Sequence, residues 1–280
     1  MRVVRKLFIL NDTLICATAV AGFVLTLLVS PTIAWAQQSA QDLAQEAANP
    51  IADLMSIPFQ LNNDFKLGQY DRTRNVLNIQ PVVPLVGGRL VTRTIFPVAW
   101  LPDLMAESGY SSSGLADIFF TAFYVPPSES LIWGVGPALE IPTGGENRGT
   151  QKWSLGPAFV ALRQVGPWTL GLLANNVWSI AGKSERSAVN KGLLQYFIVR
   201  QLGNGWYLNS APILTVNWKA ESGQRWLVPF GAGGGKLLFL GKLPVNLQSQ
   251  AYYNVVKPDV GPDWQLRVQV QILLPVPGSQ

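Results

Sequence analysis

The chain has 280 residues, of which 48% are hydrophobic and 13% are charged, and its formal net charge is +5. Soluble domains carry about 25% charged residues, so this composition favours a membrane or secreted protein, and the charge is too low for a nucleic-acid partner. The sequence has no histidine and one cysteine, Cys16. Mechanisms that need a histidine base, a cysteine nucleophile or a His/Cys metal cluster are therefore excluded.

Residues 1–36 have the pattern of a signal peptide. Arg2, Arg5 and Lys6 form a basic start, an apolar run follows, and Ala34-Trp35-Ala36 matches an A-x-A cleavage site. We expect cleavage after Ala36, which would also remove Cys16. The alternative is an uncleaved membrane anchor.

Residues 37–56 form a second segment with helical periodicity. Its apolar residues recur every three or four positions, at Leu43, Ala47, Ile51, Leu54 and Met55. Pro50 interrupts this pattern, so we expect two short helices, or one helix and a turn. The segment would either lie inside a barrel as a plug or pack on its rim.

Residues 57–280 lose the helical period and consist of strand-sized segments separated by Gly, Pro, Asn and Ser. We predict an all-β fold in which about twelve antiparallel strands form a transmembrane β-barrel. The predicted strands are 57–67, 75–83, 89–100, 114–125, 131–142, 153–164, 167–180, 191–202, 206–218, 225–236, 242–256 and 263–275.

The last predicted strand, 263–275, shows the alternation most clearly. Apolar residues occupy its even-numbered positions from Trp264 to Leu274, whereas Gln265, Arg267, Gln269 and Gln271 occupy the opposite face. In a soluble sandwich the apolar face would point into a core. In a membrane barrel it contacts lipid, and the glutamine face lines the lumen. Strands 114–125 and 191–202 are apolar on both faces, so their sequences do not show which face points inward.

Connection lengths and tryptophan positions favour the barrel. With both termini in the periplasm, each predicted outer connection has six residues or more and each inner one has five or fewer, as in outer-membrane barrels. Asn204-Gly205 suits a tight hairpin. Eight tryptophans lie near predicted strand ends, where aromatic belts contact the membrane interface: Trp100, Trp153, Trp168, Trp178, Trp206, Trp218, Trp226 and Trp264.

Several stretches resemble a bacterial family of outer-membrane proteins of the phenol-degradation MetA-pathway type, whose members are also labelled transporters or, misleadingly, neuromedin U. The resemblance rests on Asn49-Pro-Ile-Ala-Asp53, Lys152-Trp-Ser-Leu-Gly-Pro-Ala-Phe-Val-Ala-Leu162, the run 166–182, Gly205-Trp-Tyr-Leu-Asn-Ser-Ala-Pro-Ile213 and the runs 252–259 and 261–267. It implies an outer-membrane β-barrel and supplies no catalytic or binding residues. One departure is that many such barrels end in an aromatic residue, whereas this chain continues through 275–280.

The candidate functional residues are polar side chains that we expect to line the lumen. An Arg or Lys at the membrane midplane costs about 2–4 kcal/mol against lipid, so Arg93 and Arg267 should point inward. The further lumen-lining candidates are Asp64, Lys66, Asp117, Glu140, Arg200, Gln265 and Gln269. These charges would set a field that filters a solute, or they would pair with one another and seal the interior.

We expect no catalytic residue, no cofactor and no metal site, and therefore no enzyme. The run Gly231-Ala-Gly-Gly-Gly235 lacks the Gly-Lys-Ser/Thr ending of a phosphate loop. We interpret its glycines as letting a strand bend or leaving room for a neighbouring side chain.

The sequence thus predicts a porin-like transporter or channel in the outer membrane of a Gram-negative envelope. The resemblance makes small apolar or aromatic compounds the first expectation for its solutes. The expected partners are outer-membrane lipid, the barrel-assembly machinery and an unidentified small solute. The alternatives are a structural outer-membrane barrel with a closed interior and a soluble periplasmic barrel that binds lipid.

Overall fold

The computed structural model describes residues 40–52, 54–105, 111–128 and 130–274, so the predicted signal peptide lies outside the described residues. This part contains the helix α2 (Ala40–Ala47) and a sheet of fifteen strands. The strands are β1 (Met55–Leu67), β2 (Arg72–Ile79), β3 (Val82–Leu85), β4 (Leu90–Leu101), β5 (Ser112–Leu115), β6 (Ile118–Tyr124), β7 (Ile132–Ile141), β8 (Lys152–Val165), β9 (Trp168–Gly182), β10 (Asn190–Gly203), β11 (Trp206–Ser210), β12 (Ile213–Asn217), β13 (Trp226–Leu240), β14 (Leu243–Val256) and β15 (Trp264–Leu274).

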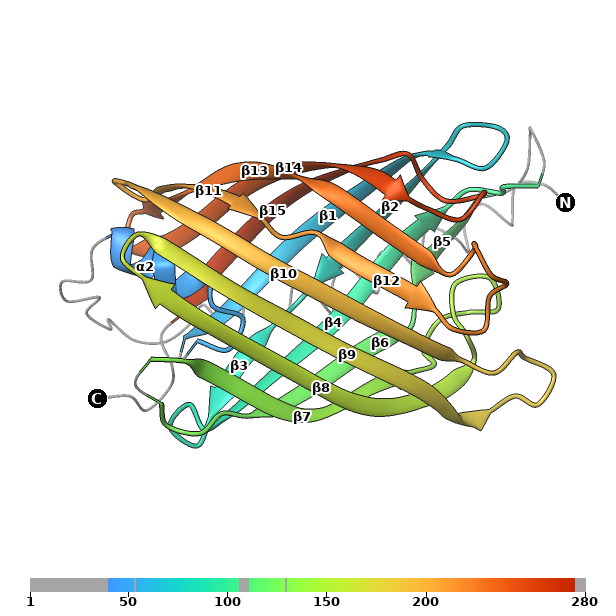
Figure 1. Cartoon of the computed structure of the whole chain (residues 1–280), viewed down its shortest axis with the longest axis horizontal. Helices are drawn as coiled ribbons and strands as arrows, with labels where there is room; N and C mark the ends of the chain where they lie inside the picture. Colours follow the sequence, from blue (N-terminus) through green and yellow to red (C-terminus); the bar gives the residue numbers. More distant parts are fainter. Residues whose placement is uncertain (1–39, 53, 106–110, 129, 275–280) are drawn as a thin grey trace, which may run out of the picture. The chain divides into compact units, whose positions relative to one another are not determined.

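The strands form one antiparallel sheet that closes on itself (Figure 1). β1 pairs with β2 on one side and with β15 on the other, and the pairing of β9 with β10 completes the ring. Three pairs of consecutive strands, β2/β3, β5/β6 and β11/β12, are each two halves of one crossing. The molecule is therefore a closed barrel of twelve antiparallel crossings with a short N-terminal helix, which confirms the predicted fold class.

Proline accounts for two of the three interrupted crossings. Pro81 separates β2 from β3, and Pro212 separates β11 from β12. Because proline has no backbone N–H, it cannot donate to a ladder at these points. The third break, at Ala116 and Asp117, has no proline and is held by side-chain contacts described below.

Side chains alternate between the outside and the inside of the ring. On β15, Leu266, Val268 and Val270 are exposed on the outer surface, whereas Arg267 and Gln271 are buried inside. The outer surface is thus apolar, as the pattern of this strand predicts, and neither a second sheet nor a helix covers it among the described residues.

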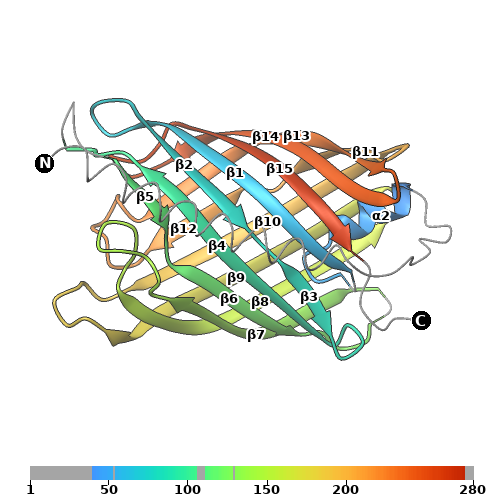
Figure 2. The same ribbon diagram turned by 180° about the vertical axis from the view of Figure 1, so that it is seen from behind.

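Short turns gather at one end of the barrel and longer loops at the other, and both views show α2 at the short-turn end (Figure 1 and Figure 2). The predicted length rule is wrong for two connections. The loop 68–71 has four residues because β2 begins three residues earlier than predicted, and the connection 125–131 on the short-turn side has seven. The turn Asn204-Gly205 has positive φ at both residues, as a tight hairpin requires.

Tryptophans mark both ends of the outer surface. All eight of the tryptophans predicted to form belts are exposed. Trp168 and Trp206 begin strands at the short-turn end, and the other six lie toward the long-loop end. Trp218 and Trp226 pack edge to face there, with ring centroids 5.6 Å apart. The outer surface therefore has an apolar band between two aromatic zones, which is the arrangement of a membrane-spanning barrel.

The N-terminal segment packs inside the short-turn end of the barrel. α2 contacts β10, β11, β13 and β14, and its Leu43 and Ala44 are buried. The helix ends before Pro50: the N–H of Asn49 donates to Glu46 O (2.9 Å), and the N–H of Ile51 donates to Asn49 Oδ1 (2.9 Å). Of the predicted options, the structure has one helix followed by a turn.

Candidate functional site: the barrel interior

Two adjacent cavities, which share four lining side chains, occupy the interior of the barrel. The larger, with a volume of about 840 Å³, lies on the long-loop side, and the smaller, of about 150 Å³, lies against α2. Residues 44 and 47–50 of the N-terminal segment line the smaller cavity, so this segment lies in the mouth of the barrel. Four side chains line both cavities and mark their junction: Gln60, Gln80, Arg93 and Gln195.

One part of the interior, which we call the apolar wall, comes from β4 and β6–β10. Its members are buried hydrophobic side chains that pack into one cluster together with Ile51 of the N-terminal segment. They are Val91, Phe123, Ala138, Ala158, Val160, Leu162, Leu173, Val177 and Phe197. Phe119 and Leu193 pack against this cluster and also line the larger cavity, so a solute there would contact apolar surface.

The opposite part, which we call the polar wall, comes from β1, β14 and β15. It consists of carboxylate, guanidinium and carboxamide side chains that point inward from neighbouring strands. Its members are Gln60, Asn62, Asp64, Asn246, Gln248, Gln250, Gln265, Arg267, Gln269 and Gln271. The interior of the barrel therefore has a polar wall on β1, β14 and β15 and an apolar cluster on β4 and β6–β10, although β7 and β10 also carry the charged pair of Glu140 and Lys191.

Arg267 is the centre of the polar wall. Its guanidinium donates to Asn62 Oδ1 (3.1 Å), Gln250 Oε1 (3.3 Å) and Gln265 Oε1 (3.2 Å). It also donates to the backbone O of Ala211 (2.9 Å), at the break between β11 and β12. Arg267 thus reaches across the lumen and satisfies an acceptor that the interrupted ladder leaves free.

Two tyrosines extend this network. The backbone N–H of Ala211 donates to Tyr252 Oη (3.1 Å), and the Arg267 guanidinium lies 5.2 Å from the Tyr252 ring centroid. Tyr207 Oη contacts Asn246 Oδ1 at 2.7 Å. A Cβ at Gly235 would lie 2.3 Å from Tyr207 Oη, so this glycine leaves room for a neighbouring side chain, as the sequence analysis proposed.

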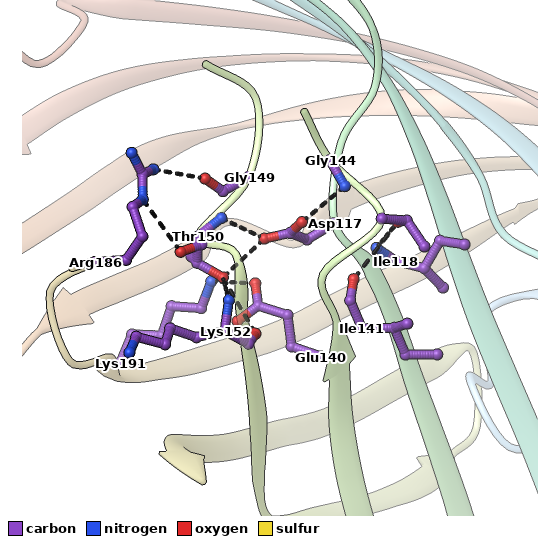
Figure 3. A network of polar contacts seen from close by, with 11 residues as sticks. Asp117, Ile118, Glu140, Ile141, Gly144, Gly149, Thr150, Lys152, Arg186 and Lys191 are labelled. Carbon is purple, nitrogen blue, oxygen red and sulfur yellow. Dashed lines mark hydrogen bonds and ion pairs between the residues drawn. The ribbon is translucent and has the colours of Figure 1, made fainter. Parts of the chain in front are cut away.

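Two ion pairs link strands on the inner face, one between the adjacent strands β1 and β2 and one between β7 and β10, which are separated by β8 and β9. Arg74 donates to Asp64 Oδ2 at 2.9 and 2.7 Å, and Gln265 Nε2 donates to Asp64 Oδ1 at 2.9 Å. Lys191 Nζ of β10 lies 2.5 Å from Glu140 Oε1 of β7, beside the larger cavity (Figure 3). Both carboxylates are buried. Their negative charges are therefore matched by basic partners.

Arg93 is held differently. One of its nitrogens, Nη2, donates to Gln80 Oε1. Within the described part of the chain, its guanidinium makes no other hydrogen bond and no ion pair. Since Arg93 lines both cavities, its remaining N–H groups adjoin the junction between them.

Asp117 anchors a loop and lines neither cavity. Its carboxylate accepts hydrogen bonds from the N–H of Gly144 (2.9 Å) and from the N–H and Oγ1 of Thr150 (2.6 and 2.9 Å), as Figure 3 shows. Arg186 donates to the backbone O of Gly149 (2.9 Å) in the same loop. These hydrogen bonds hold the loop 142–151 against the break between β5 and β6.

Two expected lumen residues point elsewhere. Lys66 is exposed with a φ of 58° at a β-bulge, and Leu67 takes the buried position in its place. Arg200 lies on the outer surface, with its guanidinium 5.3 Å from the Trp168 ring centroid. The inward assignments of both were wrong: a bulge shifts the alternation after Asp64, and β10 is apolar on both faces, which hid its phase.

The remaining candidates lie in the interior. Arg93, Arg267 and Gln269 line the smaller cavity, and Glu140 lines the larger one. Asp64 and Gln265 are linked to Arg74 and Arg267. The sequence analysis missed Lys191, Gln195 and the two tyrosines as interior groups. Tyr252 could have been predicted as an interior residue, because it lies on the same face of β14 as Gln248 and Gln250. The pair of Lys191 and Glu140 joins residues 51 positions apart, so single-strand patterns do not reveal it.

The described residues hold no group of three or more Asp, Glu, Cys or His side chains placed to bind a metal ion. They also contain no helix that is long and apolar enough to cross a membrane.

Comparison with known proteins adds a family match. Residues 44–179 match the model of the family described as "Putative MetA-pathway of phenol degradation". The family resemblance predicted from the sequence is confirmed. No curated protein matches the chain.

Solved structures share the fold. The COG4313 outer membrane channel from Pseudomonas putida F1 is 16% identical, with a TM-score of 0.59 over 88% of this chain and 100% of that chain. The NanC porin is 6% identical, with a TM-score of 0.50 over 79% and 100%. The outer membrane phospholipase OMPLA from Salmonella typhi is 13% identical, with a TM-score of 0.41 over 83% and 98%. At these identities the likeness concerns the barrel fold alone.

Proposed function

We propose that this protein is a channel of the bacterial outer membrane that passes or binds small solutes in its barrel. The observation that carries the proposal is a cavity of about 840 Å³, enclosed by a ring whose outer surface is apolar and whose interior is part polar. A soluble protein rarely exposes such a continuous apolar surface, whereas lipid covers it in a membrane barrel. The location, the lipid contact and the assembly by the barrel machinery belong to this proposal.

The proposal includes no chemical step. A hydrolase of the serine–histidine type needs a histidine, and the whole sequence has none. The polar groups of the interior are engaged mainly with one another, which suits a lining that orients solutes. Apolar and aromatic compounds remain the first expectation, supported by the family match and by the apolar wall.

A second candidate function is a structural barrel with a closed interior. The N-terminal segment at the short-turn end favours it, because Leu43 is fully buried there and residues 47–50 line the small cavity beside it. The two functions differ in whether ions pass the barrel.

Ion conductance of the refolded full chain in planar bilayers separates these functions. We expect a small conductance in the wild type and a severalfold larger one in Leu43→Glu, because a charge at this buried position displaces α2. Gln45→Glu adds the same charge at a half-buried position of the helix and should leave the conductance unchanged. Silent bilayers for all three proteins, with heat-modifiable gel mobility that proves folding, would support the structural role. Release of the protein from cells without detergent would instead support a periplasmic lipid-binding barrel.

A further inference from the structure

The charges that line the two cavities are mostly positive. The larger cavity is lined by four basic side chains, Arg74, Arg93, Lys191 and Arg225, and by one carboxylate, Glu140. The smaller cavity is lined by Arg93 and Arg267, with no carboxylate among the described residues. Even with Asp64, which holds Arg74, basic groups outnumber acidic ones along the path. A narrow lumen of low dielectric strengthens the effect of such an imbalance on passing ions.

The basic residues differ in how fully they are satisfied. Arg74 and Lys191 are paired with carboxylates, and Arg267 is bound by amide and backbone oxygens. Arg225 donates to the backbone O of Ala220 in a loop. Arg93 has one amide oxygen as its hydrogen-bond partner in the described chain. A guanidinium has five N–H donors, so Arg93 retains donors for a carboxylate, sulfonate or phosphate.

The position of Arg93 makes these donors accessible. It lies at the junction of the cavities, where the other lining groups are the neutral amides Gln60, Gln80 and Gln195. A solute that passes from one cavity to the other therefore meets one positive charge and no negative charge at this point.

The cavity that Arg93 lines on the long-loop side also has apolar lining. Ile95 follows it two positions later on β4, and Phe119, Leu173 and Leu193 line the same cavity. Burial of apolar surface contributes about 25 cal/mol per Å². A ligand with an anionic group and a compact hydrocarbon body would use both features at once, whereas a small inorganic anion would use one.

We propose that Arg93 is the anion-binding residue of the lumen, and that the channel selects small organic anions with an apolar body, such as aromatic carboxylates. The inference rests on the proposed channel function and specifies its solutes. Arg93 binds the carboxylate, the three glutamines donate further hydrogen bonds, and the apolar lining contacts the ring. Cations and uncharged analogues lack the first of these interactions.

The test is the reversal potential of the refolded full chain in a potassium chloride gradient, combined with block of the chloride current by three probes. The wild type should prefer chloride over potassium. Benzoate should block at concentrations about tenfold lower than benzamide, which has its size without the charge, or acetate, which has the charge without the ring; tenfold corresponds to about 1.4 kcal/mol.

Arg93→Gln should lower the chloride preference severalfold and remove the advantage of benzoate. Arg93→Lys keeps the charge but loses the planar fork, so it should keep the ion preference and weaken benzoate block. Arg163→Gln is the matched control, because Arg163 is exposed on the outer face of β8. It should behave as the wild type.

The outcomes separate the two proposals. A folded wild-type barrel that carries no current contradicts the channel function itself. A conducting barrel that prefers potassium, or in which benzoate and benzamide block equally, contradicts the anion site alone. An Arg93→Gln variant that keeps both the chloride preference and the advantage of benzoate contradicts the assignment to Arg93. If Arg93→Gln fails to fold, unchanged benzoate block in Arg93→Lys contradicts it in the same way.

Discussion

The polar and apolar walls of the lumen are built on the same ring yet are held together differently. The polar wall is a set of hydrogen bonds centred on Arg267, whereas the apolar wall is a packed cluster that includes Phe123, Val160 and Phe197. The strands of the polar wall alternate between polar and apolar residues, whereas β6 and β10, which contribute Phe123 and Phe197 to the apolar wall, are apolar on both faces. The interior of a barrel therefore does not need to be polar throughout, and part of this one is packed like the core of a soluble protein.

The largest effect on this comparison is expected from Phe123→Ala. Phe123 is 1% exposed within the apolar wall, so its truncation leaves a cavity that neighbouring side chains fill incompletely. We expect a loss of about 3–4 kcal/mol in the free energy of unfolding, measured by urea unfolding in lipid vesicles. Phe230→Ala, at a position that is 68% exposed on the outer surface, should cost far less. Equal losses would show that the apolar wall is not packed.

Arg267→Met should have the next largest effect. It leaves Gln250 Oε1 and Gln265 Oε1 without a hydrogen-bond donor, whereas Asn62 Oδ1 and the backbone O of Ala211 each keep an amide donor. We expect a loss of about 2 kcal/mol, since each buried acceptor left unpaired costs about 1–3 kcal/mol and water from the lumen will satisfy part of the set. Arg163→Met on the outer face should show no loss in the same urea experiment. An unchanged stability for Arg267→Met would mean that the polar wall does not depend on this residue.

Tyr207→Phe removes a smaller part of the polar wall. The change deletes the contacts of the hydroxyl with Asn246 and Gln248 while keeping the ring beside Gly235. The expected loss is about 1 kcal/mol in the free energy of unfolding. Tyr253→Phe, at an exposed position of the outer surface, provides the control. A larger loss in the free energy of unfolding for Tyr253→Phe than for Tyr207→Phe would show that the stabilising contacts lie on the outer surface.

The smallest effect is expected in the loop that joins two strands of the polar wall. The hydrogen bond from Lys257 Nζ, at 2.6 Å, lowers the pKa of the Asp263 carboxyl below its usual value. Lys257→Met should therefore raise that pKa toward the ordinary range, because the ionised form loses its partner. Carbon-detected NMR of the carboxyl group measures the shift directly. Lys219→Met in another loop should leave it unchanged, and a lowered pKa for Lys257→Met would contradict the pairing.

The sequence predicted the barrel because the polar wall makes the alternation visible. In β15 and β14, most inward positions hold glutamine or asparagine, which fixes both the strand and the face that points inward. Turn residues such as Asn204-Gly205 then place the strand ends. In β6 and β10, which belong to the apolar wall, hydrophobic residues occupy both faces. These strands were therefore predicted from their length and flanking turns, whereas the face that points inward was not predicted. Arg200 was misplaced for this reason.

Other features depend on contacts between distant parts of the chain. The bulge at Lys66 changes the alternation within one strand, and nothing in its composition indicates where the register shifts. Asp117 lies in a strand break that is stabilised by the loop 142–151, so its role follows from the folded loop. Arg93, Gln60, Gln80 and Gln195 come from four separate parts of the chain and line both cavities. The pattern of a single strand does not reveal such neighbours.

The placement of α2 sets an order for the formation of the molecule. The helix precedes every strand in the chain, yet it rests on β10, β11, β13 and β14, which are among the last to be synthesised. A contact cannot form before both of its partners exist. The N-terminal segment therefore lacks its final neighbours until the chain has been synthesised as far as β14.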